Sequence, residues 1–240
     1  MQNLEILALA GLRVDGRRPE DLRTMQHKMD CVVGADGSAY IEQGLNKVLV
    51  MIHGPQEPRK KTVDHSAEKC HVVCRVSQMP GSGTDWKQRK PGDRRTMEIE
   101  HTICQIAEEM VMLEAYPRAD LNIVVHVLES DGSLICAIIN ALCLALINAG
   151  VSMYDMVVAC SVGYVGQQFC VDVTQVEQNS GGAFLPVVIK AQSEDIIFMQ
   201  LDSRLSLELL DDAMAAGIGG CKRVQAYMEA AIRKDTITHT

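Results

Sequence analysis

The chain has 240 residues, of which 47% are hydrophobic and 22% charged, a composition typical of a globular protein. This composition excludes dominant disorder and a small disulfide scaffold. Nine cysteines, an odd number, lie mostly within apolar runs, as expected for reduced, buried thiols of an intracellular protein. We expect no secretory signal, and no membrane span, because the apolar run 134–147 is interrupted by Asn140 and is shorter than the roughly 20 residues that a bilayer requires.

The net charge of −8 argues at first against binding of nucleic acid. Residues 57–95, however, carry ten Lys and Arg against five Asp and Glu, whereas the rest of the chain is strongly acidic. A basic segment on an acidic body can bind a polyanion locally. On charge alone, an ordinary solvated loop is the slightly better interpretation.

The first half of the chain alternates strand patterns with helical ones. Residues 27–54 read as strands around a turn at 35–38, and 70–76 is another strand candidate. A loop at 80–92 precedes a helix with Asp93 as N-cap, in which apolar residues recur at helical spacing to Leu113. Next come a strand at 121–128, a turn at 131–133 and a helix at 134–148 that ends at Gly150.

The second half shows the same order of strands followed by a helix. The expected strands are 157–165, 168–173, 185–190 and 196–201. The closing helix and tail, 204–240, contain Gly217, Gly219 and Gly220, which indicate close backbone packing or a kink. No linker is visible, so residues 1–240 are predicted to form one α+β (α/β-like) domain, with residues 1–23 as an N-terminal arm and a duplicated βαβα architecture only suggested.

A basic helix start is the first candidate site. Arg94 and Arg95 stand in the first helical turn, where the helix dipole disfavours cations, and a bound phosphate would reverse the sign of that interaction. The preceding loop adds Lys87, Arg89 and Lys90, with Trp86 as a base-stacking platform or an ordinary packing anchor. Phosphate binding by this pair is modestly favoured over the alternative that both arginines are exposed and have no role.

Three further groups are weaker candidates. The run Arg59, Lys60 and Lys61 suits a phosphate-tracking loop, although a solvated charge run is the default interpretation. The set Cys70, His71 and Cys74 suggests zinc, but residues four apart in a strand lie roughly 13 Å apart, so buried structural residues are expected instead. Asp172 and Glu177 could hold a divalent metal or act as a general acid, or form a surface pair at a strand end.

Several segments stand out together along the chain: 11–23 (GLRVDGRRPEDLR), 35–39 (ADGSA) with the following GxxKV, Arg95-x-x-Glu98, Tyr116-Pro-Arg118, Glu129-x-Asp131-Gly132, Asn148-Ala-Gly150 and Ser161-Val-Gly163. Together they resemble the ribonuclease PH-like family. Their order and spacing cover nearly the whole chain. The resemblance is to core ring subunits of the RNA exosome, in particular to the counterpart of the active ring subunit of archaea.

The resemblance implies a duplicated fold, a six-membered ring of paralogous subunits and single-stranded RNA threaded 3′ end first. In active members, inorganic phosphate attacks the last phosphodiester and releases nucleoside diphosphates. Arg95, and with it Arg94, matches RNA-contacting arginines, and Asp172 matches one catalytic aspartate. Leu134 and Ile135 stand where active members have a Ser/Thr-Arg pair that holds the phosphate.

A second catalytic aspartate is matched by Gln178, and a further acidic position falls near Phe184. Gln178 cannot act as a general acid, and two apolar side chains cannot offset the repulsion between phosphate and RNA. Removing such groups one at a time typically costs about 10²- to 10⁴-fold in rate. Asp172 is then retained for structural reasons or as a relic.

The sequence therefore predicts a non-catalytic, RNA-guiding ring subunit without cofactor or metal. Its expected partners are single-stranded RNA, paralogous ring subunits, RNA-binding cap subunits and a separate hydrolytic nuclease, with no membrane. Through the resemblance we expect it in the nucleus, including the nucleolus, and in the cytoplasm.

Two alternatives stay open. One is an active, phosphate-dependent exoribonuclease whose phosphate site is rebuilt, for example from Ser180 with Arg204 or Lys190. The other is a generic α/β enzyme or interaction module unrelated to RNA.

Overall fold

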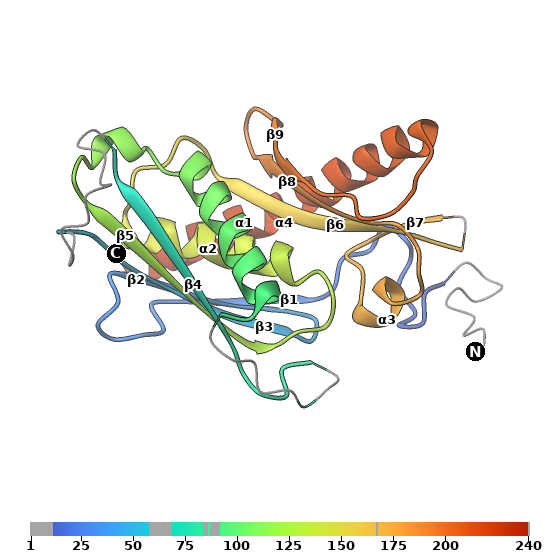
Figure 1. Ribbon diagram of the computed structural model, residues 1–240, viewed down its shortest axis with the longest axis horizontal. Coiled ribbons are helices and arrows are strands. Elements are labelled where there is room, and N and C mark those ends of the chain that lie inside the picture. The colour runs from blue at the N-terminus through green and yellow to red at the C-terminus, as the bar shows by residue number, and fades with distance from the viewer. Residues whose placement is uncertain (1–11, 58–68, 84–85, 87–91, 167, 240) are drawn as a thin grey trace.

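The computed structural model describes residues 12–57, 69–83, 86, 92–166 and 168–239. Within these described ranges, nine strands form two sheets, and four α-helices and a short 3₁₀ turn accompany them (Figure 1). The α+β prediction is confirmed. Among the described helices, none combines the length and the hydropathy that crossing a membrane requires.

The first sheet has five strands in the order β1-β2-β3-β5-β4. All neighbours are antiparallel except β4 and β5, which run parallel and are joined through α1. The bounds are β1 Met25–Met29, β2 Gly37–Gln43, β3 Asn46–Gln56, β4 His71–Gln78, α1 Arg94–Met110, the 3₁₀ turn Leu113–Ala115 and β5 Asp120–Glu129. Buried and half-buried residues alternate along β3 and β5, as a sheet with one face on the core requires.

The second sheet has four antiparallel strands in the order β7-β6-β8-β9. The bounds are α2 Leu134–Ala149, β6 Val157–Val165, β7 Gln168–Val171, α3 Gln175–Gln178, β8 Phe184–Lys190, β9 Ile196–Met199 and α4 Leu207–His239. The four-residue helix α3 was not predicted. The expected strand at 168–173 ends at Val171, because Asp172 turns the chain with a φ of 57°.

Helix α2 contacts both sheets, through β2 and β3 on one side and β6 on the other. Its apolar run therefore faces protein on every side, and its side chains from Cys136 to Leu146 are all buried. Asn140 is buried as well, and it bonds both backbone groups of Ala159 at 3.0 and 2.9 Å, which fixes α2 against β6. The helix ends at Gly150 in the left-handed conformation, as predicted.

One hydrophobic core runs through the molecule and contains residues of both sheets, with α1 packed on β4 and α4 on β6 and β8. All nine cysteines are free, and Cys136, Cys143, Cys160 and Cys170, which lie within apolar runs, are buried. Of the three residues whose pattern suggests zinc, Cys70 is buried, Cys74 is half-buried and His71 is exposed. Among the described residues, no group of three His, Cys, Asp or Glu is placed to hold a metal ion.

Candidate functional site

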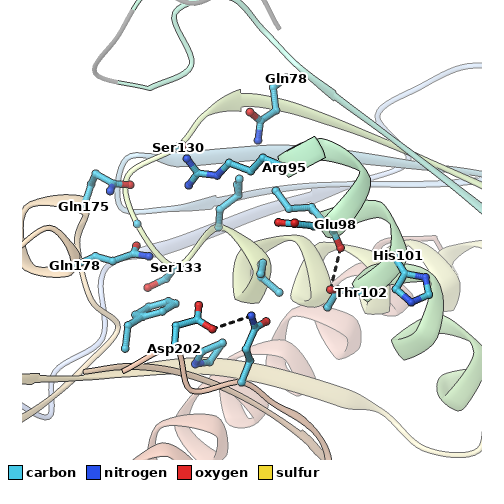
Figure 2. A pocket seen from close by; sticks show the side chains of 17 residues that line it. Gln78, Arg95, Glu98, His101, Thr102, Ser130, Ser133, Gln175, Gln178 and Asp202 are labelled. Carbon is cyan, nitrogen blue, oxygen red and sulfur yellow. Dashed lines mark hydrogen bonds between the residues drawn. The ribbon is translucent and has the colours of Figure 1, made fainter. Parts of the chain in front are cut away.

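A pocket of about 400 Å³ opens where the two halves of the molecule meet. Its walls come from α1, the start of α2, α3, β8 and the segment after β9 (Figure 2). The lining residues are Gln78, Arg95, Glu98, Ile99, His101, Thr102, Ser130, Gly132, Ser133, Leu134, Ile135, Gln175, Gln178, Phe184, Pro186, Gln200 and Asp202. The pocket thus includes five of the positions that the sequence analysis assigned to the site: Arg95, Leu134, Ile135, Gln178 and Phe184.

The floor of the pocket is the first turn of α2. Gly132 lies so close to the backbone of Thr174 and Gln175 that an added Cβ would meet it at 2.5 Å, and its φ is 68°. The next residue, Ser133, is also left-handed, and its hydroxyl is buried between Ser161 and the carbonyl of Val173, 2.7 Å away. The loop is therefore fixed, and the hydroxyl nearest the helix start is already bonded within the protein.

Leu134 and Ile135 follow directly and present apolar side chains to the pocket. A helix start favours anions through its free N–H groups and dipole. Here neither a second hydroxyl nor a cation from α2 supports that tendency, and the apolar groups exclude water from the place where an anion would be solvated.

The two arginines at the start of α1 lie in different surroundings. Arg95 lines the pocket and reaches across its mouth toward Ser130 (Figure 2). The Arg94 side chain is 93% exposed and pairs with Glu98 at 3.1 Å, one helical turn further on. The expected helix start at Asp93 is correct, although Asp93 makes no side-chain capping bond.

Carboxylates and amides dominate the remaining polar lining. Glu98 comes from α1, and Asp202, which follows β9, accepts a bond from Gln200 at 3.1 Å. Gln175 and Gln178 enter from α3, opposite Glu98 (Figure 2). Glu98, Gln200 and Asp202 carried no site role in the sequence prediction, because their approach to the pocket depends on how the two sheets pack.

Asp172 lies outside this pocket. It is fully buried at the end of β7, and its carboxylate accepts bonds from the Arg23 side chain at 2.6 and 3.0 Å and from the Arg23 backbone at 2.9 Å. The Gln43 amide adds a fourth bond at 2.9 Å. Burial alone would raise the pKa of Asp172, but these bonds and the charge of Arg23 outweigh burial and hold the pKa below its ordinary value. A carboxylate so occupied has no free lone pair directed at a substrate in the pocket.

A second buried ion pair positions α3. Arg13 contacts Glu177 with two of its nitrogens and donates to the carbonyls of Val171 and Asp172. Glu177 also accepts from the backbone N–H and the hydroxyl of Thr174 at 2.8 and 3.1 Å, so it caps the helix. Burial opposes ionisation of Glu177, yet Arg13 and the Thr174 bonds lower its pKa. Glu177 is thus a structural residue that holds Gln175 and Gln178 at the pocket wall.

The other predicted cations fall into two groups. Arg59, Lys60, Lys61, Lys87, Arg89 and Lys90 lie outside the described residues. Ser180, Lys190 and Arg204, considered for a rebuilt phosphate site, are described, and none of the three lines the pocket. Ser180 instead donates to the carbonyl of Glu177. Trp86 is 82% exposed, with its ring close to Gly81.

The chain matches two family models, described as the 3′ exoribonuclease family, domain 1, over residues 21–152 and domain 2 over residues 155–220. The models meet between α2 and β6, which is where the first sheet gives way to the second. The prediction of a single domain over 1–240 stays a prediction, and the shared hydrophobic core is the observation in its favour.

Curated relatives match along nearly their whole length. The human protein "Exosome complex component RRP41" is 35% identical over 234 residues, covering 98% of this chain and 96% of that protein. "Exosome complex component SKI6" of Saccharomyces cerevisiae is 35% identical over 236 residues, covering 98% and 95%. "Exosome complex component Rrp41" of Thermoplasma acidophilum is 36% identical over 225 residues, covering 93% and 90%.

Solved structures show the same fold at lower identity. Rice Rrp46 superposes with a TM-score of 0.81 at 24% identity, covering 91% of this chain and 99% of that one. A subunit of the Archaeoglobus fulgidus exosome, solved with RNA bound to the active site, gives a TM-score of 0.79 at 20% identity and covers 91% and 93%. On these matches, the chain belongs to the 3′ exoribonuclease family and carries both of its ribonuclease PH domains.

Proposed function

We propose that this chain is a core ring subunit of an RNA exosome that supports 3′-to-5′ RNA processing and degradation by guiding RNA without cutting it. Support for the assembly comes from relatives named as exosome components at 35% identity over nearly full length. Support for RNA as ligand comes from the neighbour of the same fold that was solved with RNA at its active site.

The observation that carries the non-catalytic part is the start of α2. In active members, as the resemblance implies, a hydroxyl and an arginine there hold the attacking phosphate. In this chain Leu134 and Ile135 line the pocket at those positions, and the Ser133 hydroxyl is buried between Ser161 and Val173. A phosphate dianion beside RNA would lack the charge-assisted bonds that offset its repulsion from the backbone.

The residues at the proton-transfer positions also support a non-catalytic role. Gln178 has an amide that cannot exchange a proton near neutral pH, where an active member has a carboxylate. Asp172 is engaged by Arg23 and Gln43 and lies away from the pocket. Because an amide stands at position 178 and no hydroxyl or cation from α2 holds the anion, we expect phosphorolysis to fall by several factors of about 10² to 10⁴.

The start of α1 still carries cations that suit an RNA path. Arg94 and Arg95, one exposed and one at the pocket mouth, are positioned to contact phosphates along an RNA strand that passes the start of α1.

The proposed partners are paralogous subunits of a six-membered ring, RNA-binding cap subunits and a separate hydrolytic nuclease. Residence in the nucleus, nucleolus and cytoplasm is part of the same proposal, and imaging of the tagged chain tests it.

A phosphate-dependence assay on the assembled ring tests the function. The ring is incubated with end-labelled RNA, with and without orthophosphate, and nucleoside diphosphates are measured. We expect RNA binding but no release of diphosphates in either condition. Phosphate-dependent release that disappears when Gln178 and Asp202 of this chain are replaced by Ala would overturn the non-catalytic assignment.

A further inference from the structure

The two described sheets have four edge strands, and three of the four carry a feature that protects the edge. On β4, the N–H of Val76 donates to Glu100 of α1 at 2.8 Å. On β7, the N–H of Val171 donates to the carbonyl of Pro19 at 2.8 Å. The edge strand β1 carries Lys28, and a lysine on an edge strand discourages pairing with another chain.

The fourth edge strand, β9, lacks these features. It lies at the edge of the four-stranded sheet (Figure 1), and its four residues are all apolar, with Ile196 41% and Met199 39% exposed. β8 pairs with one side of β9, and no described strand occupies the other side. Unpaired backbone groups beside apolar side chains are a template for a further strand, and addition of a strand is a recurring way of binding extended peptides.

A groove of about 370 Å³ lies between β9 and α1, and we call it the β9 groove. Its lining residues are Gln105, Ile106, Glu108 and Glu109 of α1 with Ile197 and Phe198 of β9. Three of these residues are apolar, two are carboxylates and none is a cation.

The two carboxylates of the β9 groove are exposed and unpaired. Neither the Glu108 nor the Glu109 side chain makes an ion pair or a hydrogen bond with another described residue. Their negative charge attracts a cationic ligand and repels the backbone of RNA. The β9 groove shares no lining residue with the pocket at the start of α2, so its occupant is a separate question from the RNA path.

We propose that the β9 groove binds an extended, cationic segment of a partner protein, which pairs with β9 as a further strand and places its charges against Glu108 and Glu109. Successive side chains of a strand point to opposite faces, so arginines at every second position would all face α1. Arginine suits the site because its guanidinium can bond one carboxylate through two N–H groups. A second copy of this chain is disfavoured, because two bodies of net charge −8 repel each other.

Peptide binding to the full-length chain, measured by fluorescence anisotropy, tests the proposal. The probe is a labelled hexapeptide of alternating valine and arginine, and the same peptide with glutamate in place of arginine is the charge control. Two further probes carry N-methyl groups on either the valines or the arginines. We expect the arginine peptide to bind and the glutamate peptide not to bind. One N-methylated probe should lose at least about tenfold in affinity, because only alternate N–H groups of a strand face its neighbour.

Variants of the chain then locate the site. Glu108→Gln/Glu109→Gln should weaken binding of the arginine peptide about tenfold, as the loss of two partly exposed ion pairs implies. Asp211→Asn/Asp212→Asn removes the same charge from two adjacent exposed carboxylates of α4 and is the matched control. It should change the affinity less than about twofold, with circular dichroism confirming the fold of both variants.

Four outcomes would overturn the proposal. They are an arginine peptide that does not bind up to about 1 mM, equal losses in the two double variants, equal affinities of both N-methylated probes and the unmodified one, and a dimer in sedimentation that Glu108→Gln/Glu109→Gln abolishes. The last outcome would assign the β9 groove to a second copy of the chain. The assay contains no RNA, so its failure leaves the proposed function untouched.

Discussion

Asp172 is the residue whose role depends most on its surroundings. It matches a catalytic aspartate of active relatives, yet its four hydrogen bonds all go to Arg23 and Gln43, on the N-terminal side of the molecule. Its left-handed conformation, with a φ of 57°, turns the chain out of β7 and aims the carboxylate toward Arg23. A buried charge in this position is matched by a buried partner, as stability requires.

We therefore predict that Asp172→Asn destabilises the fold while leaving the pocket residues in place. The variant retains the shape of the side chain but leaves the buried Arg23 charge unpaired, which costs about 3–5 kcal/mol. Urea denaturation of the purified chain at pH 7 measures the loss. The control Asp195→Asn alters an exposed carboxylate and should change the free energy of unfolding by less than about 0.5 kcal/mol.

The pH dependence of the same pair provides an internal check. The pKa of Asp172 is lowered in the folded chain, so the unfolded chain binds the proton more tightly, and the stabilisation by the ion pair is fully present above the unfolded pKa, about 3.9. This stabilisation is lost as the pH falls through the folded pKa. The stability difference between wild type and Asp172→Asn should therefore shrink steadily below about pH 4. A difference that stays constant to pH 2.5 would show that the substitution acts through packing alone.

At the residue scale, the sequence predicted local features and missed those that depend on distant partners. The start of α1 at Arg94 followed from Asp93 and the apolar spacing, and the end of α2 followed from Gly150. The orientation of the Asp172 carboxylate could not be predicted in this way, because its partner Arg23 lies 149 positions away in the chain. Nor could Asp202, since it meets α1 only when the second sheet packs against the first.

Among the elements, long periodic segments were predicted within a few residues of their observed bounds. The exception is α3, which has four residues and too short a pattern to detect. It is held instead by its local capping box and by the Arg13–Glu177 ion pair, and the ion pair depends on the N-terminal segment lying against β7. Segment 11–23 contributes to the family resemblance, but the resemblance assigns no role to Arg13 or Arg23.

The surroundings of the three glycines in α4 distinguish close backbone packing from a kink. Gly220 faces β6 and β7, where an added Cβ would lie 2.8 Å from the Cys160 sulfur and 2.7 Å from a methyl of Val171. At Gly217 an added Cβ would lie 3.0 Å from Val187 and 3.3 Å from Val162, a tight but looser approach, whereas Gly219 has nothing within 4 Å. Helix α4 continues unbroken from Leu207 to His239, so these observations favour close packing of α4 on the sheet.

This difference makes a matched pair of substitutions. Gly220→Ala inserts a methyl group into filled space and should destabilise the chain by about 1–3 kcal/mol, despite the better helix propensity of Ala. Gly219→Ala gains the propensity without the clash and should stabilise it by about 0.5–1 kcal/mol. Thermal and urea unfolding of both variants measure the two shifts. Equal shifts of the same sign would contradict the packing of α4 described here.

On the scale of the whole molecule, the apolar run of α2 has a simple cause. The helix is enclosed by the five-stranded sheet and by β6 of the four-stranded one, so no face needs a polar stripe (Figure 1). Its first turn is thereby fixed at the boundary between the halves, where the pocket forms. The order of strands and helices was predictable from the sequence, but the strand order within each sheet was not, because pairing such as β3 with β5 joins segments far apart in the chain.

The charge of the whole chain determines how RNA binding should respond to salt. The net charge is −8, so association with RNA must rely on local cations, among which Arg94 and Arg95 are described at the start of α1. Each phosphate contact on a single strand contributes roughly 0.7 to the slope of log affinity against log salt. Removal of two contacts should therefore reduce that slope by about 1.4.

Charge reversal of this pair tests the prediction directly. Arg94→Glu/Arg95→Glu should weaken RNA binding and flatten the salt dependence, measured by fluorescence anisotropy of labelled RNA between 50 and 300 mM salt, over which the Debye length shortens from about 14 to about 6 Å. The control Lys222→Glu/Arg233→Glu changes the net charge by the same amount on exposed ion pairs of α4, away from the pocket. If both double variants lose affinity equally, the effect comes from net charge. Only a loss confined to the first variant identifies the start of α1 as part of the RNA path, because the two chains repel RNA equally over long range.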